Sequence, residues 1–416
     1  MLAKHCDFTG CDRSPRDKHN RSAGKAFFVP LVLSTDTLTS LRLAPFYVAL
    51  FLIVGFQLPF WPVWLSYKGL TSEEIGIVLS SPIWAKIVFT PMIATLADYS
   101  GRRRAPLVIM SAICLGLFQF YFFSDGFWQI LILSVSIGIF FSSFTALGDN
   151  LVLTLSRTQK IDYPRIRLWG SVSFIVAAFW GGQLLSGRSA DFIPMMLSAA
   201  FLFLFLCCLM LPEVRITRTE KGRKGLRRLL KNSDFMAFLI MAGLIQGSHA
   251  ILYSSGTLQW QKQGIGDTTI GLLWAEGVIV EIILFAVARH LFSSFTPLRL
   301  LVLGGVAGLI RWLVMGFTPD LPVLVIIQTL HGVTFAATHL GAMRFIAEKL
   351  PVEISARAQG LYSAVSLGLI MGGGLFASGY LYEALASGAY LVMAGLCAAA
   401  LLISLYLRSS AEKLLH

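Results

Sequence analysis

Hydrophobic runs separated by short polar segments make up most of this 416-residue chain. Each run is about 20 residues long, which is the length that an α-helix needs to cross the hydrocarbon core of a bilayer. The pattern predicts helices over residues 44–66, 75–97, 105–124, 127–150, 167–187, 192–212, 236–258, 269–289, 297–317, 321–343, 358–381 and 388–408. The predicted fold class is therefore an all-α integral membrane protein with twelve transmembrane helices.

The polar segment between the sixth and seventh runs is the longest inside the chain and is rich in Lys and Arg. It predicts a division into two six-helix bundles joined by a basic linker. The expected organisation is a tail over 1–43, a first bundle over 44–212, the linker over 213–235, a second bundle over 236–408 and a tail over 409–416.

The two predicted bundles also share short motifs in the same order. Gly69-(x5)-Ile75-Gly76 recurs as Gly264-(x5)-Ile270-Gly271, Ala97-Asp98-(x7)-Pro106-Leu107 as Ala288-Arg289-(x7)-Pro297-Leu298, and Phe144-x-Ala146 as Phe335-x-Ala337. The offsets are 195, 191 and 191 residues. Weak internal symmetry of this kind is typical of transporters built from two pseudo-symmetric halves.

Composition supports the membrane assignment and explains the charge. The chain is 56% hydrophobic and 13% charged, whereas soluble domains average about 25% charged residues. The net charge is +12, but most basic residues fall in short loops, so it indicates membrane orientation and lipid contact rather than nucleic-acid binding. The positive-inside rule places both termini in the cytoplasm.

The sequence offers no metal, cofactor or catalytic motif. Four of the six cysteines lie in hydrophobic runs, and Cys6 and Cys11 with His5 and His19 do not have the spacing of a zinc site. No nucleotide-binding loop or catalytic triad is present. We therefore expect neither an ATP-driven pump nor a membrane enzyme, and no bound metal or cofactor.

Charged residues inside the hydrophobic runs are the first functional signal. Such a residue costs about 2.5–3.5 kcal/mol even on the insertion scale, so it needs a partner or a water-filled cavity. Asp149 near the end of one run and Arg167 near the start of the next predict either a structural ion pair or a substrate-binding pair. Lys86 lies in the middle of its run, which favours a cavity over snorkelling to the membrane surface.

Polar residues in the second half form two further groups. Gln246, His249 and Tyr253 share one helix face, which predicts either a polar wall of a cavity or a hydrogen-bonded contact between helices. Glu281 is the repeat equivalent of Lys86 at the offset of 195 residues. Burial favours the neutral form of a carboxyl group, and a neighbouring arginine favours the charged form. A glutamate that gains and loses an arginine partner can therefore carry a proton.

The loop after the second run carries a family motif. Asp98-Tyr99-Ser100-Gly101-Arg102-Arg103 resembles the D-x-x-G-R-[KR] loop of the major facilitator superfamily. The resemblance implies a gating loop formed by Asp98, Gly101 and Arg102. In the second half, Arg289 and Phe292 stand at the Asp and Gly positions, so that copy of the motif is degenerate.

A closer resemblance, to the lactose permease branch of this superfamily, is carried by Asp149-(x17)-Arg167 followed by Leu168-Trp169-Gly170. It implies that Asp149 and Arg167 bind substrate, and that Glu276, Arg311 and His331 serve substrate binding or proton coupling. Two positions depart from that branch: Thr334 and Gln328 stand where it has a Glu and a Lys.

Over residues 44–408 the chain is most similar to the 3-phenylpropionate permease group. The residues that carry this similarity are Leu58-Pro59-Phe60-Trp61, Gly69-Leu70-Thr71, Asp162-Tyr163, Arg167-Leu168-Trp169-Gly170-Ser171-Val172, Leu244-Ile245-Gln246-Gly247-Ser248-His249-Ala250, Leu330-His331 and Ala342-Met343-Arg344. The resemblance implies a monomeric proton symporter of the bacterial inner membrane that imports a small organic acid. A proton symporter for a sugar or nucleoside, and a non-transporting sensor or scaffold on the same fold, are the alternatives.

The sequence and these resemblances together predict three sets of site residues. The substrate set is Lys86, Asp149, Arg167, Gln246 and His249; the proton-coupling set is Glu276, Glu281, Arg311 and His331; the gating set is Asp98, Gly101 and Arg102. Glu276 is the first hypothesis for the proton carrier, with Arg167 as its partner, and Glu281 is the second. Trp61 and Trp64 are expected to be interfacial anchors.

Overall fold

The computed structural model describes residues 35–157, 159–214 and 229–413, and their regular elements are helices. The first half contains α1 (Thr35–Tyr67), α2 (Ser72–Ser100), α3 (Arg104–Gln119), η1 (Phe120–Phe123), α4 (Phe127–Phe141), α5 (Phe144–Leu155), α6 (Tyr163–Leu185) and α7 (Phe192–Met210). The second half contains α9 (Ser233–Gly247), η2 (Leu252–Gly256), α10 (Thr257–Lys262), α11 (Asp267–Leu291), α12 (Pro297–Gly316), α13 (Leu321–Gly332), η3 (Val333–Ala337), α14 (Thr338–Lys349), α15 (Val352–Ala364), η4 (Val365–Ile370), α16 (Met371–Leu385), η5 (Ala386–Gly388) and α17 (Ala389–Lys413).

Eleven helical segments of the described residues are long and apolar enough to cross a membrane, which confirms the predicted all-α membrane class. The last segment, Ile354–Ser409, has 56 residues, more than twice the about 20 residues that one crossing needs. The turn at η5 interrupts it, with Ala386 at φ 49°. The predicted helices 358–381 and 388–408 both lie within this segment.

Helix ends are set by local sequence. Thr71 begins α2 with a capping box, because its hydroxyl accepts from the Glu74 backbone N–H while the Glu74 carboxylate accepts from the Thr71 N–H. Gly101 ends the same helix in the left-handed conformation at φ 63°. Asp162 caps α6, and Pro164 follows it in the first turn.

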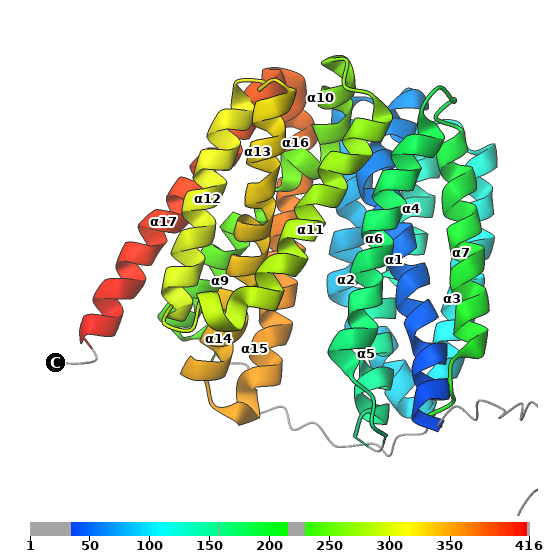
Figure 1. Cartoon of the computed structure of the whole chain (residues 1–416), viewed down its shortest axis with the longest axis horizontal. Helices are drawn as coiled ribbons and strands as arrows, with labels where there is room; N and C mark the ends of the chain where they lie inside the picture. Colours follow the sequence, from blue (N-terminus) through cyan, green and yellow to red (C-terminus); the bar gives the residue numbers. More distant parts are fainter. Residues whose placement is uncertain (1–34, 158, 215–228, 414–416) are drawn as a thin grey trace, which may run out of the picture.

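The two halves lie side by side and meet along two antiparallel helix pairs, α2 with α16 and α6 with α11 (Figure 1). We call the end that carries Arg102, Arg103, Arg104 and Arg165 the basic end; it is the lower end in Figure 1. Toward this end α11 leans away from α6, while the two helices pack closely near the opposite end.

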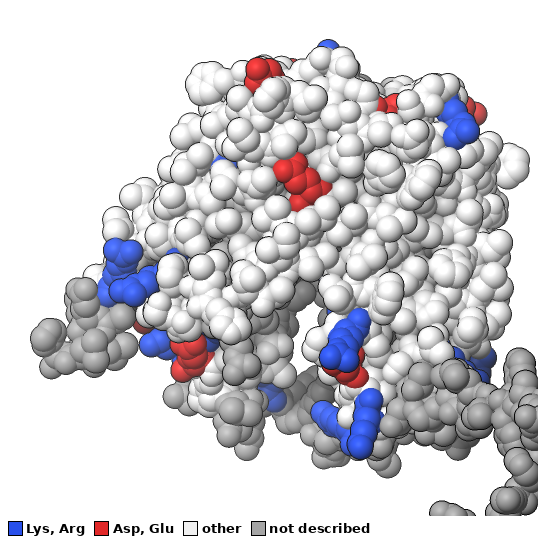
Figure 2. Space-filling model, viewed as in Figure 1, with Lys and Arg blue, Asp and Glu red and all other residues white. Residues whose placement is uncertain are grey.

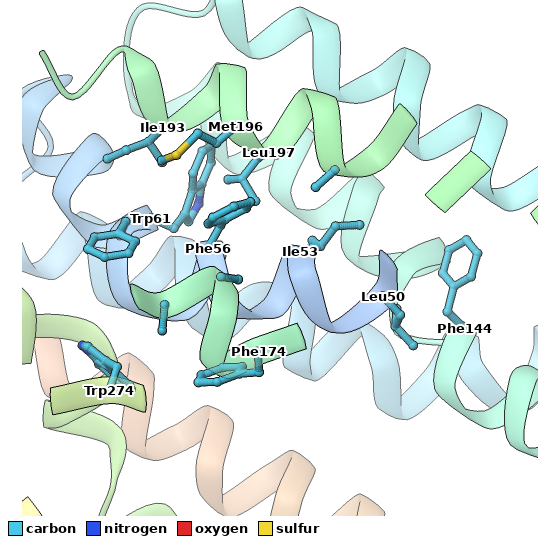
Figure 3. Packing of buried hydrophobic residues seen from close by; sticks show 14 of the residues in the cluster. Leu50, Ile53, Phe56, Trp61, Phe144, Phe174, Ile193, Met196, Leu197 and Trp274 are labelled. Carbon is cyan, nitrogen blue, oxygen red and sulfur yellow. The ribbon is translucent and has the colours of Figure 1, made fainter. Parts of the chain in front are cut away.

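Helix α1 forms the centre of the first half (Figure 3). Its side chains Leu50, Ile53, Phe56 and Trp61 pack between α7, through Ile193, Met196 and Leu197, and α6, through Phe174. Trp61 and Trp64 stack on each other with ring centroids 4.5 Å apart and are only 3% and 1% exposed. The prediction that they are interfacial anchors is therefore wrong: these two tryptophans belong to the core of the bundle.

Three membrane helices of the second half contain π-helical segments, namely η2, η3 and η4. A π-helical turn leaves some backbone groups out of the regular ladder and is frequent at functional sites. In this chain η2 presents Tyr253 and η3 presents Phe335 to the space between the halves. The irregular backbone thus shapes the cavity wall.

The surface has the charge distribution of a membrane protein (Figure 2). A broad uncharged band crosses the face in view, and basic side chains gather near the lower end, around a hollow between the halves. Acidic side-chain atoms interrupt this otherwise uncharged band where it covers α11. Such a charge in a lipid-facing band is uncommon.

Candidate functional site

Two adjacent cavities lie near the interface of the halves; the first is lined by residues of both halves, and the second mostly by residues of the first half. The first, which we call the arginine cavity, has a volume of about 240 Å³ and is lined by Phe51, Val54, Leu58, Arg167, Ser171, Phe174, Leu252, Tyr253, Leu273, Trp274, Gly277, Val278, Glu281, Arg311, Gln328, His331 and Phe335. The second, the lysine cavity, has a volume of about 440 Å³. They share Val54, Leu58 and Tyr253 as a common wall.

Arg167 reaches the arginine cavity from the first half. Its guanidinium lies over the Phe51 ring at 4.1 Å and over the Tyr47 ring at 5.5 Å. Two aromatic faces therefore hold the cation in place without neutralising it. Arg167 thus lines the cavity, and its role in substrate binding stays a prediction.

Asp149 lies next to Arg167 but is not one of the residues that line the cavity. Its carboxylate accepts a 2.6 Å hydrogen bond from the Tyr47 hydroxyl. Among the described residues, no ion pair within 4.0 Å joins Asp149 to Arg167. Tyr47, which could not be predicted as a site residue from the sequence, thus contacts both charged residues.

Arg311 reaches the same cavity from the second half and is fully buried. Its guanidinium donates to Gln328 Oε1 at 2.7 Å, faces His331 Nδ1 at 3.1 Å and donates to Thr334 Oγ1 at 3.4 Å. Gln328 and Thr334 are neutral and His331 can be, and Arg311 Nε has no hydrogen-bond partner among the described residues. A buried cation without a carboxylate contact is costly, so Arg311 favours an anion inside the cavity.

Glu281 is the acidic residue that lines the arginine cavity. In the described part of the chain, its carboxylate makes no ion pair within 4.0 Å. Glu276 instead lies between Leu272 and Ile279, which are 49% and 43% exposed and face the membrane. Glu276 therefore lies on the outer stripe of α11. The cavity geometry therefore favours Glu281 over Glu276 as the internal carboxylate.

Gln246 and His249 are fully buried behind the cavity wall rather than on it. His249 Nδ1 faces the Gln246 carbonyl at 3.0 Å, and His249 Nε2 faces Thr334 Oγ1 at 3.1 Å. Gln246 donates to the Phe335 carbonyl at 3.4 Å. These contacts correspond to the interhelical alternative for this polar stripe, and only Tyr253 of the stripe lines the cavities.

The lysine cavity has an aromatic wall. Its lining residues are Val54, Gln57, Leu58, Trp61, Val78, Leu79, Pro82, Ile83, Lys86, Phe118, Tyr121, Ser134, Ile137, Gly138, Phe141, Ser142, Thr145, Phe201, Tyr253, Met371 and Leu375. The charged residue among them is Lys86. Within the described residues, no carboxylate lies within 4.0 Å of its ammonium, and no side chain hydrogen-bonds to it.

An ion pair spans the turn of the predicted gating loop. Arg103 Nη2 lies 2.5 Å from Asp98 Oδ1, and the Gly101 N–H donates to the Asp98 carbonyl at 3.3 Å. The Arg103 N–H also reaches Glu213 Oε1 and the Val214 carbonyl at the end of the first half. Arg102 itself is exposed, so Arg103 is the arginine that contacts Asp98 here.

Some residues that line the cavities could be recognised as such only from the structure. Tyr253 lines both cavities because η2 shifts the helix register, and Gln57 is a polar residue in an otherwise apolar stretch of α1. Tyr47 shows no pattern that separates it from other membrane-helix tyrosines. Its role depends on α5 and α6, which bring Asp149 and Arg167 to it.

A helical fold in two halves around a charged central cavity defines a multi-pass membrane transporter of the major facilitator type. The chain belongs to the MFS_1 like family, whose profile matches residues 40–392. A similar curated protein is the probable 3-phenylpropionic acid transporter of Escherichia coli K12, 32% identical over 84% of this chain and 92% of that protein. The maltose permease of Geobacillus stearothermophilus is 26% identical over 88% of this chain and 94% of the permease.

Solved structures agree in fold. The nucleoside transporter NupG superposes with a TM-score of 0.77 at 17% identity, over 89% of this chain and 98% of that chain. A bacterial homologue of the human lysosomal transporter Spinster, in an inward-facing and unoccupied conformation, superposes with a TM-score of 0.65 at 13% identity. The match covers 89% of this chain and 95% of that chain. The family assignment and these relatives identify a transporter rather than an enzyme.

Proposed function

We propose that this protein is a proton-coupled symporter that imports a small aromatic carboxylic acid across the bacterial inner membrane. The observation that carries the proposal is the Lys86 ammonium, which lies in an aromatic cavity at membrane depth without a carboxylate partner. A cation in such a place needs an anion to offset its desolvation. The substrate carboxylate supplies that anion.

The shape of the lysine cavity supports an aromatic substrate. Trp61, Phe118, Tyr121, Phe141 and Phe201 offer ring faces and edges around an otherwise apolar space. Aromatic rings pack against one another in offset or edge-to-face geometry and gain free energy beyond their buried area. The similarity to a probable 3-phenylpropionic acid transporter favours the same substrate class.

Charge also favours an anion over a neutral sugar or nucleoside. The residues that line the two cavities include Lys86, Arg167 and Arg311 as cations and Glu281 as the acid. This surplus of positive charge suits an organic anion, and proton uptake by Glu281 would increase it. Both cavities lie within one chain, so we expect a monomer to suffice, with lipid and protons as its other partners.

The test is uptake of labelled 3-phenylpropionate into membrane vesicles, with 3-phenylpropionamide as a neutral competitor of the same shape. Lys86→Ala should raise the KM for the acid about tenfold or more, because a hydrogen bond to a charged group is lost. It should also abolish the preference for the acid over the amide. Lys68→Ala is the matched control, since Lys68 pairs with Asp125 at the surface.

The outcomes separate the alternatives. An unchanged acid preference in Lys86→Ala would show that Lys86 does not bind the carboxylate. If sugars or nucleosides compete as well as the acid does, the alternative of a sugar or nucleoside symporter is favoured. Labelled substrate that binds but never accumulates would indicate a sensor. Dependence of accumulation on an imposed pH gradient tests the proton as the coupling ion.

A further inference from the structure

A groove on the membrane-facing side of the first half lies apart from both cavities. It runs between α3 and α7, which pack against each other on the side of that half farthest from the second half, at the right-hand edge of Figure 1. Its volume is about 670 Å³. The small residues Ala112, Gly116 and Ala199 form its floor, and all three are exposed. A Cβ atom added to Gly116 would have no neighbour within 4 Å, so the floor has room for a ligand.

The side chains along this groove suit a hydrocarbon ligand. Leu115, Leu202 and Phe205 are among the apolar residues that line it. The polar side chains that line it are Gln119 and Ser198, and they bond to each other. Gln119 Nε2 donates to Ser198 Oγ at 3.0 Å and to the Leu115 carbonyl at 2.9 Å, and Ser198 Oγ lies 3.2 Å from Gln119 Oε1. Because these polar groups already have partners, the groove favours an apolar occupant.

Arg104 places a cation at the basic end of the same groove. Its guanidinium donates to the Leu209 carbonyl in the last turn of α7. Among the described residues, no carboxylate lies within 4.0 Å of this guanidinium. Leu209 is four residues beyond Phe205, which corresponds to about 6 Å along the helix. Arg104 is also the first residue of α3, so it lies where the hydrocarbon core gives way to the lipid headgroups.

We propose that the α3–α7 groove binds an anionic phospholipid, with the phosphate at Arg104 and one acyl chain along the groove floor. One leaflet of the hydrocarbon core is about 15 Å deep, which is the rise of about ten helical residues. Counted from Leu209, this depth reaches Ala199. An acyl chain anchored at Arg104 therefore covers the small residues of the floor. This binding site is independent of the proposed transport substrate.

Charge favours a lipid over a second copy of this chain as the occupant. Two copies related by a twofold axis along the membrane normal would meet through the same surface patch. That arrangement would bring Arg102 and Arg104 of both copies together, and like charges facing each other disfavour an interface. An anionic headgroup has the opposite charge, and basic residues next to a membrane-spanning helix attract such lipids.

Photo-crosslinking in lipid nanodiscs tests the site. Full-length protein in phosphatidylcholine nanodiscs receives a trace of phosphatidylglycerol, or of phosphatidylcholine, that carries a diazirine on one acyl chain. Mass spectrometry of peptides then locates the crosslinks. Phosphatidylglycerol should label the peptides of α3 and α7 about fivefold more than phosphatidylcholine does, because its headgroup gains the contact with one basic residue.

Variants separate the charge of Arg104 from its contact with Leu209. Arg104→Gln should remove the preference for phosphatidylglycerol, whereas Arg104→Lys keeps the charge and should retain most of the preference. Ala112→Phe fills the groove floor and should reduce labelling of the groove by both lipids. Arg299→Gln is the matched control, because Arg299 is exposed in the first turn of α12, in the other half. It should leave the labelling of α3 and α7 unchanged.

Several results would overturn the proposal. These are equal labelling of the groove by the two lipids, a preference that survives in Arg104→Gln, and a preference lost equally in Arg104→Lys. Unchanged labelling in Ala112→Phe would show that the acyl chain does not lie on the groove floor. Crosslinks between two copies through α3 and α7, in place of lipid crosslinks, would identify a second copy as the occupant.

Discussion

At the scale of single residues, Tyr47 connects the two charges that the sequence places around the α5–α6 turn. Its hydroxyl donates to Asp149 at 2.6 Å, and its ring lies 5.5 Å from the Arg167 guanidinium. Tyr47→Phe keeps the ring and removes the donor. We expect it to cost about 1.5–3 kcal/mol of interaction, as for a hydrogen bond to a charged group, and to lower kcat/KM for uptake about tenfold or more.

A double-mutant cycle with Asp149→Asn measures this contact. If the hydrogen bond is shared, the double variant should transport no worse than the poorer single variant. Tyr67→Phe is the control, since its hydroxyl donates to the exposed Asp191 at 3.0 Å, and its effect should stay within about 0.5 kcal/mol. Strictly additive losses would show that Tyr47 and Asp149 act separately.

The residue scale is also where prediction from sequence reaches its limit. Arg167, Lys86, Glu281, Arg311 and His331 could be predicted, because a charged or titratable side chain in a hydrophobic run needs an explanation. Which wall each one lines could not be predicted. Spacing shows that Glu276 and Glu281 point in different directions, but only the positions of the neighbouring helices show that Glu281 faces the cavity.

At the scale of elements, hydrophobic length predicted the helices well, because the bilayer fixes how many apolar residues a crossing needs. The span predicted at 44–66 corresponds to α1, which begins nine residues earlier at Thr35. The π-helical segments were not predictable: η3 contains neither Gly nor Pro, and the single glycines of η2 and η4 do not distinguish them, because glycines are also common in the regular helices. Their backbone depends on packing between helices.

The glycine contacts of α2–α16 and α6–α11 form seals near the end opposite to the basic end. A Cβ atom on Gly182 would meet the Asp267 backbone, and one on Gly76 would lie 2.8 Å from the Leu375 carbonyl oxygen. Backbone cannot yield as a side chain can, so Gly182→Leu should force α6 and α11 apart. A cysteine at Gln57 in the lysine cavity should then react about tenfold faster with a membrane-impermeant maleimide added outside the cell.

Gly116→Leu is the control for this substitution. Gly116 is also a helical glycine, on α3, but a Cβ atom there would have no neighbour within 4 Å. The added side chain should therefore leave the labelling rate of Gln57→Cys unchanged. Equal rates for Gly182→Leu and Gly116→Leu in folded protein would mean that the glycine contact does not close this end.

At the scale of the whole molecule, the internal repeat of the sequence has a structural counterpart. Gly76 and Gly271 are repeat equivalents at the offset of 195 residues. Each packs against a helix of the opposite half: Gly76 against α16 near Gly379, and Gly271 against α6 at Ala178. The repeat therefore encodes a matched pair of seals, as expected for two halves that rock about a central site.

The orientation of the molecule in the membrane follows from its charge asymmetry. Arg102, Arg103 and Arg104 lie at the short connection between α2 and α3 at the basic end, while Asp125 and Asp191 lie in loops at the opposite end. Short loops rich in Lys and Arg stay in the cytoplasm, so we expect the basic end, with the gating loop, to face inward. In intact cells, Asp125→Cys should react with an impermeant maleimide, whereas Arg102→Cys should react only after the membrane is permeabilised. The reverse pattern would contradict this orientation, because the basic end, toward which the cavity between the halves widens, would then face the outside of the cell.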